Sequence, residues 1–218
     1  MDAGFRDAIG ASPMTISTWP FAPFAPFSFD LVMADPPWPW AAYSDKGLEK
    51  SPEAQYATMS MEAIAAFPVG DLLAPGGVLF LWCTWPLFAA QAALAARWGL
   101  EVKTGGVWAK RTPSGKLRWG TGYLLRSVCE PFLIATLKGS GFRGASEPNR
   151  IETIFPDGFE LDGLAREHSR KPDEAYALLE RVLPAARRLD LFSRQSRPGW
   201  SSWGNEAGKF DASVEAIA

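Results

Sequence analysis

The sequence predicts a Rossmann-like α/β fold, in which a doubly wound, mostly parallel sheet carries helices on both faces. Three observations predict it. Apolar runs alternate with helical patterns along the chain, which is typical of strand–helix–strand units. The runs at 29–34 and 78–82 lack alternation of polar and apolar residues, as expected of strands covered on both faces. The length of 218 residues suits one domain whose core needs neither disulfides nor a metal.

The chain is predicted to begin with a leader, residues 1–27, followed by a single domain, residues 28–218. The leader is rich in Pro and Phe, and its prolines exclude a regular helix or a central strand. We therefore expect the leader to be extended and to cover apolar surface. The first strand, 29–34, follows it directly.

The next elements are defined by caps and turns. Ser60 is a typical helix N-cap, and helical spacing after it predicts a helix to about Leu73. A turn at 75–77, Pro-Gly-Gly, leads into the second strand, 78–82. The alanine-rich stretch 87–98 predicts a helix.

The second half of the chain continues the same alternation. Strands are predicted at 107–109 and 132–136, and one strand of the sheet can be antiparallel. Pro172 favours the first turn of a helix that runs to about Leu183. The segment 188–192 is the last predicted strand. Ligands of such sheets bind at the carboxyl ends of the strands.

Composition excludes several function classes. The formal net charge of −2 argues against a protein that coats nucleic acid nonspecifically, although it allows a local basic face. Cys83 and Cys129 are far apart and His168 is the single histidine, so no metal site is expected. The sequence has no long apolar stretch and no amino-terminal signal, which predicts a soluble cytoplasmic protein without membrane association.

The tetrapeptide Asp35-Pro36-Pro37-Trp38 directly follows the first predicted strand. The Asp35 carboxylate and the Pro36 carbonyl are two acceptors without a donor, which suits the two N–H groups of an exocyclic amine of a base. Hydrogen bonds held in place in this way lower the barrier to methyl transfer. Trp38 offers a face on which the base can stack. The alternative is a turn that ends a buried strand, with Trp38 in the core.

A basic span without acidic residues runs from Val102 to Cys129 and includes several aromatic side chains. This composition is typical of a surface that follows a phosphate backbone and stacks bases. The alternative is a strand with a solvated loop. The candidate substrate-binding residues, one of which precedes this span, are Tyr56, Trp108, Lys110, Arg118 and Tyr123.

The chain resembles the MT-A70 family of S-adenosylmethionine-dependent adenine-N6 methyltransferases, of a prokaryotic or phage type. Six blocks in the family order carry the resemblance over roughly residues 29 to 206. They are Ala34-Asp35-Pro36-Pro37-Trp38, Gln55-Tyr56-Ala57-Thr58-Met59-Ser60, Leu79-Phe80-Leu81-Trp82, Ser169-Arg170-Lys171-Pro172-Asp173-Glu174, Asp190-Leu191-Phe192-Ser193-Arg194, and Gly199-Trp200 with Trp203-Gly204-Asn205-Glu206. The resemblance implies a class I methyltransferase fold and S-adenosyl-L-methionine as cofactor.

Cofactor-binding positions follow from the resemblance, and general chemistry supports several of them. The implied residues are Asp35, Lys171, Asp190, Phe192, Arg194, Asn205 and Glu206. Lys171 suits the donor carboxylate, Asp190 suits the ribose hydroxyls, and Asp35 can also meet the donor ammonium. Each has a simpler alternative: Lys171 can form a surface pair with Glu174, and Asn205 can be a turn residue. Glu206 departs from the glutamine that many relatives carry.

The resemblance implies methyl transfer to the N6 amine of adenine in nucleic acid, with DNA expected before RNA. A noncatalytic nucleic-acid-binding or scaffold subunit of a methyltransferase complex is a second reading, and cytosine-N4 methylation a third. Expected partners are nucleic acid and either a second copy or another subunit. Glu130 is given no catalytic role.

Overall fold

The computed structural model describes residues 19–39, 58–112, 114–120, 124–140, 147–154, 171–209 and 211. Within this part of the chain, one seven-stranded sheet has the order β5-β3-β4-β2-β1-β6-β7. Its strands are β1 (Phe29–Ala34), β2 (Leu73–Trp82), β3 (Leu100–Arg111), β4 (Cys129–Leu137), β5 (Arg150–Ile154), β6 (Arg188–Leu191) and β7 (Trp200–Trp203). The helices are α2 (Met61–Ala65), α3 (Phe88–Arg97) and α4 (Asp173–Val182), with 3-10 turns η2 (Val69–Leu72) and η3 (Trp85–Leu87).

Six of these strands run in one direction and β4 runs against them. β1 is parallel to β2 and β6, β6 is parallel to β7, and β3 is parallel to β5. β4 is antiparallel to both of its neighbours, β2 and β3. The predicted α/β class, with a mostly parallel sheet and one antiparallel strand, is confirmed. The carboxyl ends of β1, β2, β3 and β6 therefore meet at one edge, where β4 begins.

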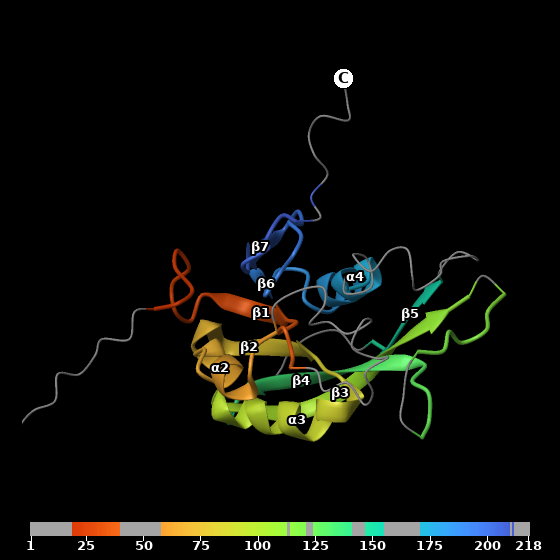
Figure 1. The fold of residues 1–218 in the computed structure, drawn as a ribbon. Coiled ribbons are helices and arrows are strands. Elements are labelled where there is room, and N and C mark those ends of the chain that lie inside the picture. The colour runs from red at the N-terminus through yellow and green to blue at the C-terminus, as the bar shows by residue number, and fades with distance from the viewer. Residues whose placement is uncertain are drawn as a thin grey trace, which may run out of the picture.

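Helices cover both faces of the sheet (Figure 1). Successive side chains of a strand point to opposite faces, so Val32 and Ala34 pack with α2 and α3 in one core cluster. Leu31 and Met33 pack with α4 in the other cluster. Both faces of β1 are thus buried over residues 31–34, which explains the apolar run there.

Two predicted helices begin or end elsewhere. Ser60 caps α2 as expected, and its side chain accepts a hydrogen bond from Ala63 N at 3.1 Å. The helix ends at Ala65 instead of Leu73, because Pro68 follows and cannot donate within a helix. At α4, Pro172 is the residue before the helix, with an extended backbone, and does not lie in the first turn.

The sequence did not predict the two edge strands, and β2, β3 and β4 are longer than predicted, whereas β1 has the predicted bounds. β5 and β7 are short and lie at the two edges of the sheet. β2 begins at Leu73 and includes the predicted turn at 75–77, and its register with β1 shifts between the Phe29–Leu73 and Leu31–Val78 pairs. At Gly77 an added Cβ would lie 2.8 Å from the Ala74 carbonyl oxygen, so only glycine fits this irregular entry.

Residues 19–27 of the predicted leader form turns against the domain, where an extended segment was predicted. Phe21 is completely buried, and its ring packs 5.1 Å from the ring of Trp203 and 5.8 Å from that of Phe67. This segment therefore covers apolar surface of the first core cluster. Residues 1–18 lie outside the described part, and the domain boundary at 27/28 stays a prediction.

Candidate active site at the carboxyl edge of the sheet

The Asp35-Pro36-Pro37-Trp38 segment is held by backbone hydrogen bonds at the end of β1. Asp35 N–H donates to the Leu191 carbonyl at 3.3 Å, which ties it to the end of β6. Trp38 N–H donates to the Pro36 carbonyl at 2.8 Å, which makes a three-residue turn. A carbonyl oxygen has two lone pairs, so Pro36 keeps the capacity to accept a second hydrogen bond.

A chain of alternating charges leads away from Asp35. Lys171 Nζ lies 3.3 Å from Asp35 Oδ1 and 3.1 Å from Glu130 Oε2, and Lys110 Nζ lies 2.5 Å from Glu130 Oε1. The four side chains come from the end of β1, the residue before Pro172 and α4, the start of β4 and the end of β3. Because all of these points lie at the same edge of the sheet, the fold brings together residues that are up to 136 positions apart.

The charges of this chain set its pKa values. Burial raises the pKa of the Asp35 carboxyl above its ordinary value, and the nearby Glu130 charge adds to this although Lys171 opposes it. Burial also acts to raise the pKa of Glu130, but Lys171 and Lys110 outweigh it and hold the pKa at about 2. The two carboxylates likewise outweigh burial at Lys171 and raise its pKa. Lys171 is therefore permanently charged.

A second polar group forms where β6 ends. Asp190 is 5% exposed, and its Oδ2 accepts hydrogen bonds from Tyr176 Oη at 2.7 Å and from Ser193 Oγ at 2.9 Å. Burial raises the pKa of Asp190 to about 6 against the effect of these two donors. The hydroxyls thus tie the turn after β6 to α4.

The turn itself is strained. Phe192 has φ 65°, a left-handed conformation that is uncommon outside glycine. Gly204 passes so close that an added Cβ would lie 2.6 Å from the Ser193 carbonyl oxygen. The Ser193 N–H donates to the Trp203 carbonyl at 2.9 Å, which pins the turn to the end of β7. Strain held by neighbouring structure is common at binding sites.

These two groups border one pocket between the ends of β1 and β6. Three residues of its lining carry a buried polar atom with no hydrogen-bond partner in the described structure: Trp82 Nε1, Gln195 Oε1 and Arg197 Nε. Buried polar groups are normally paired, so two donors and one acceptor in one pocket fit a polar ligand. The other lining residues are Met33, Asp35, Lys171, Tyr176, Asp190, Phe192, Ser193 and Arg194.

A family model, MT-A70, matches residues 29–206. The chain belongs to the MT-A70 family. Methyltransferases of this family use S-adenosyl-L-methionine, whose carboxylate, ammonium and ribose supply the acceptors and donors that the unpaired atoms of the pocket require. Asp35 would hold the ammonium, Lys171 the carboxylate and Asp190 the ribose.

Curated members of the MT-A70 family resemble the chain over most of its length. It is 32% identical over 195 residues to "N6-methyladenosine RNA methyltransferase MTA1" of Cryphonectria parasitica, covering 87% of this chain and 54% of that protein. It is 34% identical to "N(6)-adenosine-methyltransferase MT-A70-like" of Arabidopsis thaliana, covering 82% and 24%. It is 28% identical to human "N(6)-adenine-specific methyltransferase METTL4", covering 84% and 38%. The chain thus spans about half or less of these relatives.

The MT-A70 resemblance implied seven cofactor residues, and the structure places five of them in the lining of the pocket: Asp35, Lys171, Asp190, Phe192 and Arg194. Glu206 joins this group indirectly, because Arg194 Nε lies 3.2 Å from its Oε2. Asn205 is exposed in the turn after β7. The cofactor role of each residue stays a prediction.

The proposed stacking residues lie deeper than predicted. Trp38 is 7% exposed, belongs to the first core cluster and donates its indole N–H to the Trp82 carbonyl at 3.2 Å. Trp108 is 2% exposed and packs against Trp82, with Lys110 Nζ 4.2 Å from the centre of its ring. Such burial does not support stacking of a base on Trp108. The reason is its place in β3, between β4 and β5, where its ring packs against Trp82 in the second core cluster.

Of the remaining candidate substrate-binding residues, Lys110 and Arg118 are described by the structure, and two tyrosines are not. Lys110 points into the charge chain through Glu130 instead of the solvent. Arg118 lies on the segment between β3 and β4, where its N–H donates to the Lys110 carbonyl at 2.7 Å. Tyr56 and Tyr123 lie outside the described residues, as do the loop 41–55 and His168.

Sequence reasoning gave no role to Glu130 and did not consider Tyr176, which the structure places in the two polar groups of the site. Glu130 is the first acidic residue after the basic span and lies at the start of β4, at the edge that carries Asp35, which is the signal that could have found it. Tyr176 had no such signal, because only the packing of α4 places its hydroxyl beside Asp190. Among the described residues, no group of three or more His, Cys, Asp or Glu side chains could hold a metal.

Proposed function

We propose that this chain transfers a methyl group from S-adenosyl-L-methionine to the N6 amine of adenine in nucleic acid. The observation that carries the proposal is the intact Asp35-Pro36-Pro37-Trp38 segment, with Lys171 3.3 Å from the Asp35 carboxylate in the lining of the pocket. A subunit that only positions substrate would need neither the acceptor pair nor its counter-charge. These features favour catalysis over a scaffold role.

The residues divide the work as follows. The Asp35 carboxylate accepts one N–H of the adenine amine and the Pro36 carbonyl accepts the other, which draws the nitrogen lone pair out of conjugation with the ring. When bound, S-adenosyl-L-methionine would supply a methyl group on a positively charged sulfonium; transfer to that nitrogen would break the carbon–sulfur bond and release the neutral thioether S-adenosylhomocysteine. The methylated nitrogen carries an extra proton, and the raised pKa of Asp35 suits it to take that proton before passing it to water.

Lys171 positions Asp35. Its ammonium is held between Asp35 and Glu130, so the carboxylate cannot rotate freely away from the end of β1. Glu130 in turn is held by Lys110. Pre-organised charges of this kind need no rearrangement during the reaction.

The polymer is part of the proposal. The composition, rich in Ala, Pro and Arg, is typical of a prokaryotic or phage protein and favours DNA as the polymer substrate. DNA is therefore the first candidate. RNA is the second, because the fungal relative is named an RNA methyltransferase; the relatives named above are all eukaryotic. A second copy or another subunit can supply sequence recognition.

The test is methyl transfer from labelled S-adenosyl-L-methionine to matched single-stranded and duplex DNA and RNA, with nucleoside mass analysis. Asp35→Asn keeps the shape but replaces an acceptor oxygen with a donor, and should lower kcat by about 100-fold or more. Asp30→Asn, on the same strand and paired with Arg187 at 3.0 Å, is the matched control. Near-normal turnover by Asp35→Asn would refute the mechanism, and cofactor binding without product on any polymer would favour the scaffold reading.

A further inference from the structure

Two exposed tryptophans follow strands that end at the edge carrying Asp35; Trp119 belongs to the basic span that the sequence singled out, and Trp85 lies outside that span. Trp85, in η3 three residues after β2 ends, is 49% exposed. Trp119, on the segment between β3 and β4, is 61% exposed. Trp85 comes three residues after the carboxyl end of β2, at the edge that carries Asp35, and Trp119 lies on the segment that leaves β3 at the same edge.

Trp85 is fixed beside the charge chain. Its indole N–H donates to the Cys129 carbonyl at 3.0 Å, and Ser127 Oγ donates to the same carbonyl at 2.7 Å. The next residue along the chain is Glu130, which binds Lys171. Trp85 is therefore connected, through one backbone carbonyl, to the residue that shares a lysine with Asp35.

The segment between β3 and β4, residues 112–128, is here called the arm; 113 and 121–123 lie outside its described residues. Figure 1 shows it projecting from the right-hand end of the sheet. Gly120 N–H donates to the Ser127 carbonyl at 2.6 Å, and Arg126 Nε donates to the Gly120 carbonyl at 2.9 Å. The Arg126 guanidinium lies 5.4 Å from the centre of the Trp119 ring. The Trp119 ring thus lies against Arg126, and the next residue, Gly120, is hydrogen-bonded to Ser127, which shares the Cys129 carbonyl with Trp85.

The arm combines positive charge with exposed apolar side chains. It contains Lys116, Arg118 and Arg126 and no acidic residue, although the whole chain has a net charge of −2. Of the seven exposed large hydrophobic residues in the described chain, four lie on the arm, including Leu124 at 87% and Leu125 at 83%. Positive groups that alternate with exposed rings and apolar side chains suit a strand of nucleic acid, in which phosphates alternate with bases.

We propose that Trp85 and Trp119 are stacking platforms for the bases that flank the target adenine, and that the basic side chains of the arm contact the adjoining phosphates. The inference rests on the proposed function. It predicts that the nucleic acid strand lies along a path from Asp35 to the arm, here called the track. A second copy of the chain is the competing occupant, because Leu124 and Leu125 could also pack against protein. The absence of acidic residues from the arm favours nucleic acid, since a self-complementary interface would bring its positive charges together.

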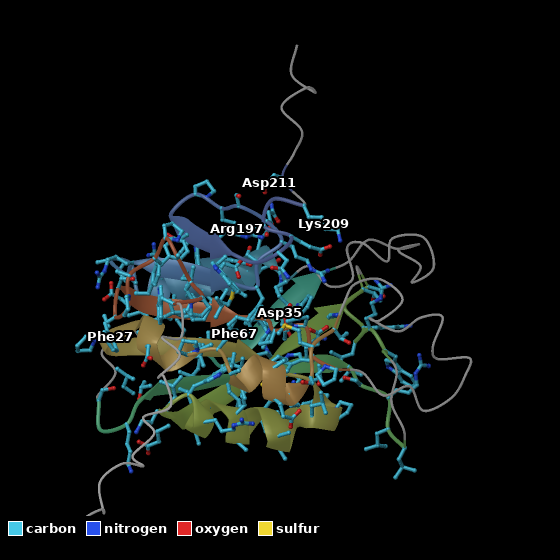
Figure 2. All side chains as sticks on the ribbon, turned by 60° about the vertical axis from the view of Figure 1, so that its left-hand side comes forward. Phe27, Asp35, Phe67, Arg197, Lys209 and Asp211 are labelled. Atoms are coloured by element: carbon cyan, nitrogen blue, oxygen red, sulfur yellow. The ribbon has the colours of Figure 1, made fainter. Side chains whose placement is uncertain are left out.

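The test uses Trp85→Ala, Trp119→Ala and Arg126→Ala in the full chain. Binding is measured by fluorescence anisotropy with labelled single-stranded DNA and RNA of roughly 12 nucleotides, a length within the range of single-strand binders. Phe27→Ala is the matched control, because Phe27 is 55% exposed and lies well away from Asp35 (Figure 2). Sedimentation velocity and binding of S-adenosyl-L-methionine are measured on the same proteins.

Each tryptophan substitution should weaken binding of the oligonucleotide by roughly 5- to 100-fold, with cofactor binding unchanged. Arg126→Ala should lower the salt dependence, the slope of log K against log salt, by about 0.7. Trp85→Phe keeps a ring but loses the hydrogen bond to Cys129, so it should retain most of the affinity. A loss as large as that of Trp85→Ala would mean that the hydrogen bond, rather than stacking, matters, and would overturn the role of Trp85.

The outcomes separate this inference from the proposed function. If the intact protein methylates adenine and the Trp85 and Trp119 variants bind like the control, the track is wrong and the function stands. If no polymer is methylated but binding depends on both tryptophans, the function fails and the track stands. If Trp119→Ala converts a dimer into a monomer while affinity for the oligonucleotide is unchanged, the arm is an interface between copies and the inference is overturned.

Discussion

Replacing Glu130 with glutamine tests the charge chain most directly. The two lysines that contact Glu130, at 2.5 and 3.1 Å, hold its pKa at about 2, against 4.5 for an ordinary glutamate. At about 1.4 kcal/mol per pKa unit, this difference corresponds to about 3 kcal/mol of folding free energy. The side chain is 29% exposed, so solvent screening reduces the value, and we expect Glu130→Gln to lower the free energy of unfolding by about 2 kcal/mol at pH 7.

The pH dependence gives the sign of the effect. Glu130 has a lowered pKa in the folded state, so its contribution is fully present above about pH 4.5, the unfolded value, and is lost as the pH falls towards 2. The difference between Glu130→Gln and the intact protein should therefore shrink between pH 4.5 and pH 3. For a domain of this size, 2 kcal/mol corresponds to a decrease in Tm of about 4–8 °C at pH 7.

Urea denaturation and thermal unfolding from pH 7 to pH 3 measure this difference. Glu101→Gln is the control, because Glu101 pairs with Lys103 at 2.7 Å on the exposed amino end of β3, and its Tm should not change measurably. An unchanged or raised Tm in Glu130→Gln would refute the reasoning, since it would mean that burying the charges costs as much as their pairing returns.

Three further substitutions test other parts of the site. Lys171→Ala leaves two neighbouring carboxylates without their shared cation, so it should destabilise the fold by about 3 kcal/mol in urea denaturation and also weaken cofactor binding in calorimetry. Tyr176→Phe removes a donor from Asp190, whose pKa is about 6; its cost should be about 2 kcal/mol at pH 8, where Asp190 is ionised, and about 1 kcal/mol at pH 5, and equal costs at both values would contradict this. Gly204→Ala places a Cβ 2.6 Å from the Ser193 carbonyl oxygen and should weaken cofactor binding at least 10-fold in calorimetry, whereas unchanged affinity would show that the turn can move.

The inner elements of the fold could be predicted from local sequence. The apolar run at 31–34 in β1 and the alanine-rich α3 have patterns that few other structures produce. The edge strands β5 and β7 could not be predicted, because a short edge strand is formed by its one neighbour and not by its own pattern. No described helix of this fold has the length and apolar character to cross a membrane.

Whether a tryptophan side chain is buried or exposed is likewise decided by the tertiary structure. Every tryptophan has the same side chain, so the sequence does not show which ones are buried. The neighbouring motifs favoured Trp38 and Trp108 as stacking residues. In the fold both are buried, since β3 is an inner strand and the turn after Asp35 folds back onto the core. Trp85 and Trp119, on the connections after β2 and β3, are 49% and 61% exposed, so position after a strand does not by itself decide depth.

By itself the sequence determined that Asp35 follows a buried strand and stands beside a proline carbonyl, because four neighbouring residues carry that information. Only the tertiary structure decided that Lys171, Glu130 and Lys110 form one chain of charges with it. The four residues come from different elements, and an ion pair depends on distances of a few ångströms that the order of residues along a chain does not fix. The parallel sheet supplies those distances, since it brings the ends of its strands to one edge.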